Sequence, residues 1–108
     1  EVSPDEWARW RSDTTWAPPG GESLEALGRR VRSGLDALMD DAVDRTVVVV
    51  THVSPVKAAL GWALGVGDEV AWRSFVAPAA VMRIGVYRRG RKSEQSLITF
   101  GETDHLVR

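Results

Sequence analysis

The hydrophobic pattern of this chain changes abruptly near its middle. Residues 47–51 read Val-Val-Val-Val-Thr, a run with no polar face. Such a run is typical of a parallel strand buried on both sides, so we expect it to be the central strand of an α/β sheet. Hydrophobic residues then recur at helical spacing over 56–64, and Gly65 is placed to end that helix. Ser54 and Pro55 are predicted to begin it, with the Ser54 hydroxyl as cap.

His52 falls between the predicted strand and the predicted helix. This is the position where open α/β sheets bind ligands and where a helix N-terminus favours an anion. An imidazole there can donate to a phosphate or carboxylate. The competing interpretation is a turn histidine that hydrogen-bonds a backbone carbonyl, and the histidine alone does not decide between them.

The remaining pattern predicts further elements on both sides of this segment. They are a helix over 4–10 capped by Ser3, a long amphipathic helix capped by Ser23, a short helix over 68–73, and a hairpin of strands 81–87 and 96–100. We expect Leu27, Val31 and Leu35 of the long helix to share one core with valines 47–50. Arginines 29, 30 and 32 are predicted to be solvated.

Composition narrows the possible functions. The chain has 108 residues, enough for one small domain, and a net charge of −1 that attracts neither nucleic acid nor an anionic membrane. It contains no cysteine, which excludes disulfides and thiolate metal sites and favours a cytoplasmic location. No apolar run is long enough to span a bilayer. We interpret the acidic residues 40, 41 and 44 and the basic cluster 88–92 as solvated charges, not as cation or nucleic-acid sites.

Three motifs together carry a resemblance to a known family. They are the strand ending in Thr51-His52, the segment Pro18-Pro19-Gly20-Gly21-Glu22-Ser23 before a long helix, and the close Gly101-Glu102-Thr103-Asp104-His105-Leu106. In this combination the chain resembles the histidine phosphatase (phosphoglycerate mutase-like) superfamily. Most members of the superfamily have glycines after this histidine. The segment 53–55 has none and is most similar to the phosphatase half of actinobacterial ribonuclease H–acid phosphatase fusions. We interpret His105 as structural.

The resemblance implies a three-layer α/β/α fold and phosphoryl transfer from a phosphorylated small molecule through a phosphohistidine. His52 would contact the phosphoryl group, and the Val53 amide and Ser54 would line its pocket. Glu22 would lie on the substrate side, although a carboxylate near a helix start is also favoured by the helix dipole alone. The resemblance implies no metal or cofactor, because arginines and histidines stabilise the negative charge of the phosphoryl group in this superfamily.

The resemblance also shows what this chain lacks. The nucleophile motif R-H-G, a second arginine and the acid near F-G-x-W-E-G do not occur, and Glu1 begins just downstream of where that acid would lie. Residues 1–108 thus match the C-terminal portion of one domain. We expect the missing N-terminal half to be a partner of this chain, with a homodimer as the alternative association. We expect the chain alone to have no phosphatase activity. A serine hydrolase built on Ser54 lacks a third group to orient His52. A non-catalytic interaction or regulatory half-domain is the alternative function.

Overall fold

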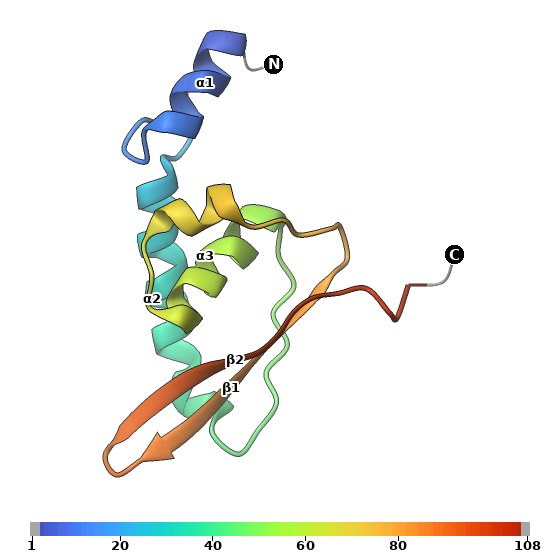
Figure 1. Ribbon diagram of the computed structural model, residues 1–108. Helices are drawn as coiled ribbons and strands as arrows, with labels where there is room; N and C mark the ends of the chain where they lie inside the picture. Colours follow the sequence, from blue (N-terminus) through green and yellow to red (C-terminus); the bar gives the residue numbers. More distant parts are fainter. Residues whose placement is uncertain (1–2, 107–108) are drawn as a thin grey trace.

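The computed structural model describes residues 3–106; Glu1, Val2, Val107 and Arg108 lie outside the described residues. Six elements follow one another along the chain (Figure 1). They are the helices α1 (Pro4–Ser12), α2 (Leu24–Ala42) and α3 (Val53–Leu64), the 3₁₀ helix η1 (Asp68–Arg73), and the strands β1 (Val81–Arg89) and β2 (Lys92–Glu102). Within the described residues, the only sheet is the antiparallel pair of β1 and β2.

The first two helices begin at serine caps, as their sequences predict. The Ser3 hydroxyl accepts the Glu6 amide at 3.2 Å, and the Glu6 carboxylate accepts the Ser3 amide at 3.3 Å, which forms a capping box. The Ser23 hydroxyl accepts the Ala26 amide at 3.0 Å at the start of α2. Each serine satisfies an N–H group that the helix leaves unpaired, so the predictions for both helix starts are confirmed.

The core lies around α3, which packs against α2, η1 and β2. The buried hydrophobic residues of the described chain are Leu24, Ala59, Leu60, Trp62, Ala71 and Val76. The Trp62 indole donates to the Asp36 carboxylate of α2 at 2.9 Å, which fixes the two helices together. Gly65 ends α3 at φ 70°, a left-handed conformation that glycine adopts without strain, so its predicted role is confirmed.

The hairpin is longer than its alternating pattern predicts. Strands β1 and β2 are joined by Gly90 and Arg91, and Gly90 adopts φ 63° at the turn. Near the turn, the Arg88 guanidinium and the Ser93 hydroxyl both approach the Asp40 carboxylate of α2, at 3.3 and 3.5 Å. The basic end of the hairpin therefore contacts the acidic end of α2 through an ion pair and a hydrogen bond.

The central strand does not form in the described chain. Residues 46–51 are extended but pair with no strand, and Val48 and Val50 are 80% and 92% exposed. The prediction of one core containing valines 47–50 is wrong here, because burial requires neighbouring strands and the described residues supply none beside this segment. Of the α2 residues assigned to that core, Leu27, Val31 and Leu35 are half-buried.

The overall size of the molecule is larger than that of a compact domain, as expected when residues 46–51 do not pack into a sheet. Its radius of gyration is 15.3 Å, whereas a compact chain of this length has a value of about 13 Å. Residues 46–52 run as an extended segment without strand pairing from the end of α2 to the start of α3 (Figure 1). The expected three-layer sandwich is absent from residues 3–106. Among these residues, no helix is both long and apolar enough to cross a membrane.

Candidate functional site

His52 lies at the N-terminus of α3, as the sequence predicts, but in a different role relative to the helix. It is itself the N-cap residue, with extended backbone at φ −122° and ψ 174°, and α3 begins at Val53. Ser54 and Pro55 are therefore the second and third residues of the helix, so the prediction that Ser54 caps it is wrong. The His52 side chain is exposed and makes no cap hydrogen bond.

The first turn of α3 offers a small set of hydrogen-bond donors beside His52. The Val56 amide already donates to the His52 carbonyl at 3.1 Å, and Pro55 has no N–H group. The amides of Val53 and Ser54 make no hydrogen bond within the described residues. These two amides, the imidazole and the Ser54 hydroxyl all belong to the N-terminal end of α3, where the helix dipole favours an anion. We call His52, Val53 and Ser54 the α3 turn.

Glu22, which lies just before α2, is hydrogen-bonded by an arginine of that helix. The Arg30 guanidinium donates to both carboxylate oxygens of Glu22, at 3.0 Å each, across two turns at the start of α2. The hydrogen bond from Arg30 is the main reason that the pKa of Glu22 lies below its ordinary value of 4.5. Among the described residues, no hydrogen bond or ion pair joins Glu22 to His52. The structure therefore does not bring these two predicted site residues into direct contact.

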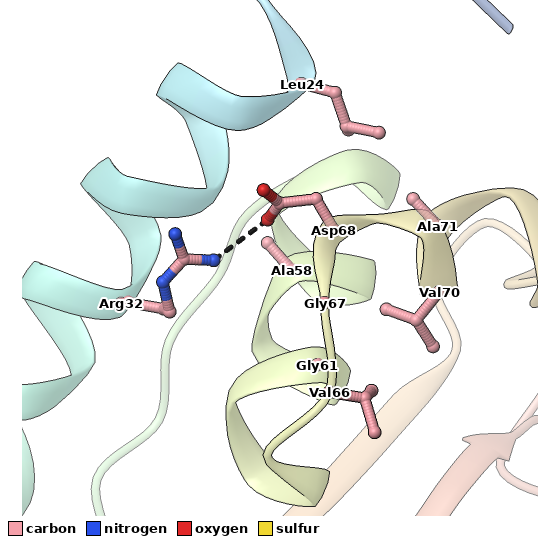
Figure 2. Close-up of a pocket in the computed structure, with 9 residues that line it drawn as sticks. All are labelled: Leu24, Arg32, Ala58, Gly61, Val66, Gly67, Asp68, Val70 and Ala71. Atoms are coloured by element: carbon pink, nitrogen blue, oxygen red, sulfur yellow. Dashed lines mark hydrogen bonds and ion pairs between the residues drawn. The ribbon is translucent and has the colours of Figure 1, made fainter. Parts of the chain in front are cut away.

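The junction of α2, α3 and η1 contains a cavity of about 10 Å³, too small for a substrate (Figure 2). The Arg32 guanidinium donates to the Asp68 carboxylate at 2.8 Å across this junction. Both side chains are partly shielded, so the prediction of a solvated Arg32 is wrong. Gly28 lies against the same carboxylate, and a β-carbon at this position would collide with it. This junction is a packing contact, and His52 does not line it.

The second histidine has a structural position. The His105 ring lies 2.8 Å from the Ala79 carbonyl and holds the C-terminal segment against the loop before β1, which confirms its structural interpretation. Nearby, the Thr99 hydroxyl and the Arg83 guanidinium donate to Glu102 and keep the pKa of its carboxyl below 4.5. Within residues 3–106, no group of three or more histidine, aspartate or glutamate side chains is arranged to hold a metal ion.

Some contacts in the structure were not predicted from the sequence. The Lys57 ammonium donates to the Ala71 carbonyl at 3.0 Å, and the Arg30 guanidinium donates to the Glu22 carboxylate. The eight-residue separation of the second pair matches no simple helical contact rule, because Glu22 lies before the helix. Gly28 was a usable signal, since a glycine inside a strong helical pattern often marks a close approach of another element.

The α3 turn thus places His52 at the N-cap of α3 and Val53 and Ser54 in its first turn, where the helix dipole favours an anion. The sequence profile described as histidine phosphatase superfamily (branch 1) matches residues 1–98, and the chain belongs to this superfamily, an α/β family of phosphatases and mutases. It is similar to the bifunctional protein Rv2228c of Mycobacterium tuberculosis and to the uncharacterized protein Mb2253c of Mycobacterium bovis. Each is 39% identical over 93 residues.

These alignments cover 86% of this chain and 26% of each relative. The chain thus spans about a quarter of the length of the curated relatives that it matches. No solved structure matches the chain significantly.

Proposed function

We propose that this chain supplies the second-histidine part of a phosphoryl-transfer site that works through a phosphohistidine. The observation that carries the proposal is the α3 turn. It combines an exposed imidazole that makes no cap hydrogen bond with two backbone amides that have no partner within residues 3–106. His52 would donate to an oxygen of the transferred phosphoryl group. Preplaced donors of this kind stabilise the negative charge that is spread over the phosphoryl oxygens in the transition state.

The neighbouring residues have separate proposed roles. The amides of Val53 and Ser54 and the Ser54 hydroxyl would line the phosphate pocket. Glu22 would lie on the substrate side, where the hydrogen bonds from Arg30 keep its carboxylate ionised and fixed in direction. The substrate would be a phosphorylated small molecule in the cytoplasm. No metal or cofactor has a role in this proposal, since histidines, arginines and backbone N–H groups meet the phosphoryl charge.

The proposed site is incomplete within this chain. Its sequence contains no R-H-G, so the nucleophilic histidine and its companion arginine would come from the missing N-terminal half of the domain. The exposed valine segment 47–50 supports this, because it offers unpaired backbone and apolar side chains that a neighbouring strand would cover. We therefore propose that the chain alone does not hydrolyse phosphate esters, and that the missing half, or a second copy, covers the segment.

Nuclear magnetic resonance of the two histidine rings tests the proposed anion site. Adding phosphate or orthovanadate to the chain should shift the ring signals of His52 in a saturable way. His105 is the matched control, because its ring is held by the Ala79 carbonyl and its signals should move far less. Equal, non-saturable shifts of both histidines would mean that the α3 turn holds no anion. A crystal grown with vanadate should show the ion within hydrogen-bond reach of His52.

A second candidate function is a non-catalytic interaction or regulatory half-domain. The exposed valine segment favours it, since such a surface binds another polypeptide whether or not chemistry follows. The two candidates differ at His52. An anion that binds at the α3 turn favours the phosphoryl-transfer site, whereas partner binding without an anion site favours the interaction module.

A further inference from the structure

Helix α1 carries an aromatic surface that the described part of the chain does not cover. None of its residues is buried, and it lies at one end of the molecule, beyond the start of α2 (Figure 1). Trp7 and Trp10 stack with ring centroids 5.6 Å apart and an interplanar angle of 16°, and Trp7 is 54% exposed. Trp10 is half-buried, and an exposed tryptophan stacked on a second one is typical of interaction surfaces.

Opposite charges flank the two tryptophans on the same side of the helix. With 3.6 residues per turn, Glu6, Trp7, Trp10 and Arg11 fall on one side of α1, and we call them the α1 face. The structure shows this grouping directly, since the Arg11 guanidinium lies 5.7 Å from the centre of the Trp7 ring. Arg9 points elsewhere, over the Trp16 ring at 5.6 Å.

The α1 face is complementary to itself. The order Glu-Trp-x-x-Trp-Arg places the acid and the base at equal distances from the midpoint of the face. In an antiparallel pair of α1 helices, Glu6 of each copy would lie opposite Arg11 of the other, and the tryptophans would meet between them. Two-fold symmetry makes both charge pairs at once. We propose that the α1 face is a self-association surface and that its occupant is α1 of a second copy of this chain.

The charges favour a second copy over an acidic peptide or a nucleic acid. An acidic peptide or a nucleic acid would satisfy Arg11 but would be repelled by Glu6, whereas a second copy satisfies both. The contact is small, because four tryptophans cover at most about 1,000 Å², less than the roughly 1,200 Å² of a stable interface. The dimer is therefore weak and forms reversibly as the protein concentration rises.

Sedimentation equilibrium of two charge variants, alone and mixed, tests this surface. In Glu6→Arg or Arg11→Glu homodimers, both charge pairs become repulsive, and we expect association to weaken by about tenfold or more. An equimolar mixture of the two variants restores both pairs, so association should return to the wild-type level. Asp5→Arg is the control, because it makes the same charge change on another side of α1 and should have little effect.

The mixing experiment separates this surface from association through the valine segment. Pairing of residues 47–50 would not depend on the charges of α1 and would persist in each variant alone. Arg11→Glu leaves the capping box of α1 intact, so its weakened association stands as evidence even if Glu6→Arg loses the helix. The proposal is wrong if wild-type chains stay monomeric up to about 1 mM. It is also wrong if Arg11→Glu alone associates as well as the wild type. A mixture that associates no better than its components also contradicts it when Glu6→Arg keeps the helical circular dichroism of the wild type.

Discussion

Substitution of one buried leucine and one exposed valine compares the stability contributions of the packed core and of the exposed valine segment. Leu60 of α3 is 5% exposed in the core, whereas Val50 is 92% exposed. Burying a leucine side chain contributes about 1.5–3 kcal/mol, and the cavity left by alanine adds to the loss. Leu60→Ala should therefore lower the free energy of unfolding by about 2–5 kcal/mol. Val50→Ala should change it by less than about 0.5 kcal/mol, as surface substitutions do.

Urea unfolding followed by tryptophan fluorescence measures both changes, because Trp62 lies in the same core, two residues after Leu60. The protein should be dilute enough that self-association does not contribute. If Leu60→Ala prevents folding, Leu60→Met is the milder variant, with an expected loss below about 1.5 kcal/mol. A loss for Val50→Ala as large as that for Leu60→Ala would refute the reasoning, since it would mean that the valine segment is buried in the free chain.

Two further predictions concern contacts of α2. Arg30→Ala should raise the pKa of the Glu22 carboxyl toward 4.5 in a carboxyl carbon titration, because the hydrogen bonds from Arg30 are the main cause of its lowering. The contribution of this pair to stability is present above pH 4.5 and is lost as the pH falls through the lowered pKa; an unchanged pKa would contradict the contact. Gly28→Ala should lower the melting temperature, although alanine normally stabilises a helix interior by about 1 kcal/mol, because its β-carbon meets the Asp68 carboxylate. A raised melting temperature would show that this junction is loose.

The elements that could be predicted from sequence are those fixed by local chemistry. Ser3 and Ser23 cap their helices because a side-chain oxygen three residues from an unpaired amide is a local arrangement. Gly65 ends α3, and the alternating residues around Gly90 form a hairpin, for equally local reasons. His52 could be placed at the start of a helix on the same basis, although the helix begins two residues earlier than Ser54 and Pro55 predict.

The failures concern contacts between distant parts of a chain. Residues 47–51 have the composition of a buried strand, but the pattern cannot say which strands would bury it, and within residues 3–106 none does. Arg32 looked solvated by helical position, yet it pairs with Asp68, which is 36 residues away. The link between Glu22 and Arg30 was missed for a related reason, because it joins a loop to a helix.

The central claim is that His52 belongs to a phosphoryl-transfer site that another part of the domain completes. The most direct measurement is hydrolysis of p-nitrophenyl phosphate by this chain alone, by a mixture with a polypeptide carrying the R-H-G half, and by the same mixture with His52→Ala. Removing one stabilising donor commonly costs about 10²–10³ in rate, and catalytic groups that act as a unit fail together. We predict no turnover by the chain alone, turnover in the mixture, and its loss by at least about 10²-fold with His52→Ala. Turnover by the chain alone, or a mixture that is indifferent to His52→Ala, would contradict the account.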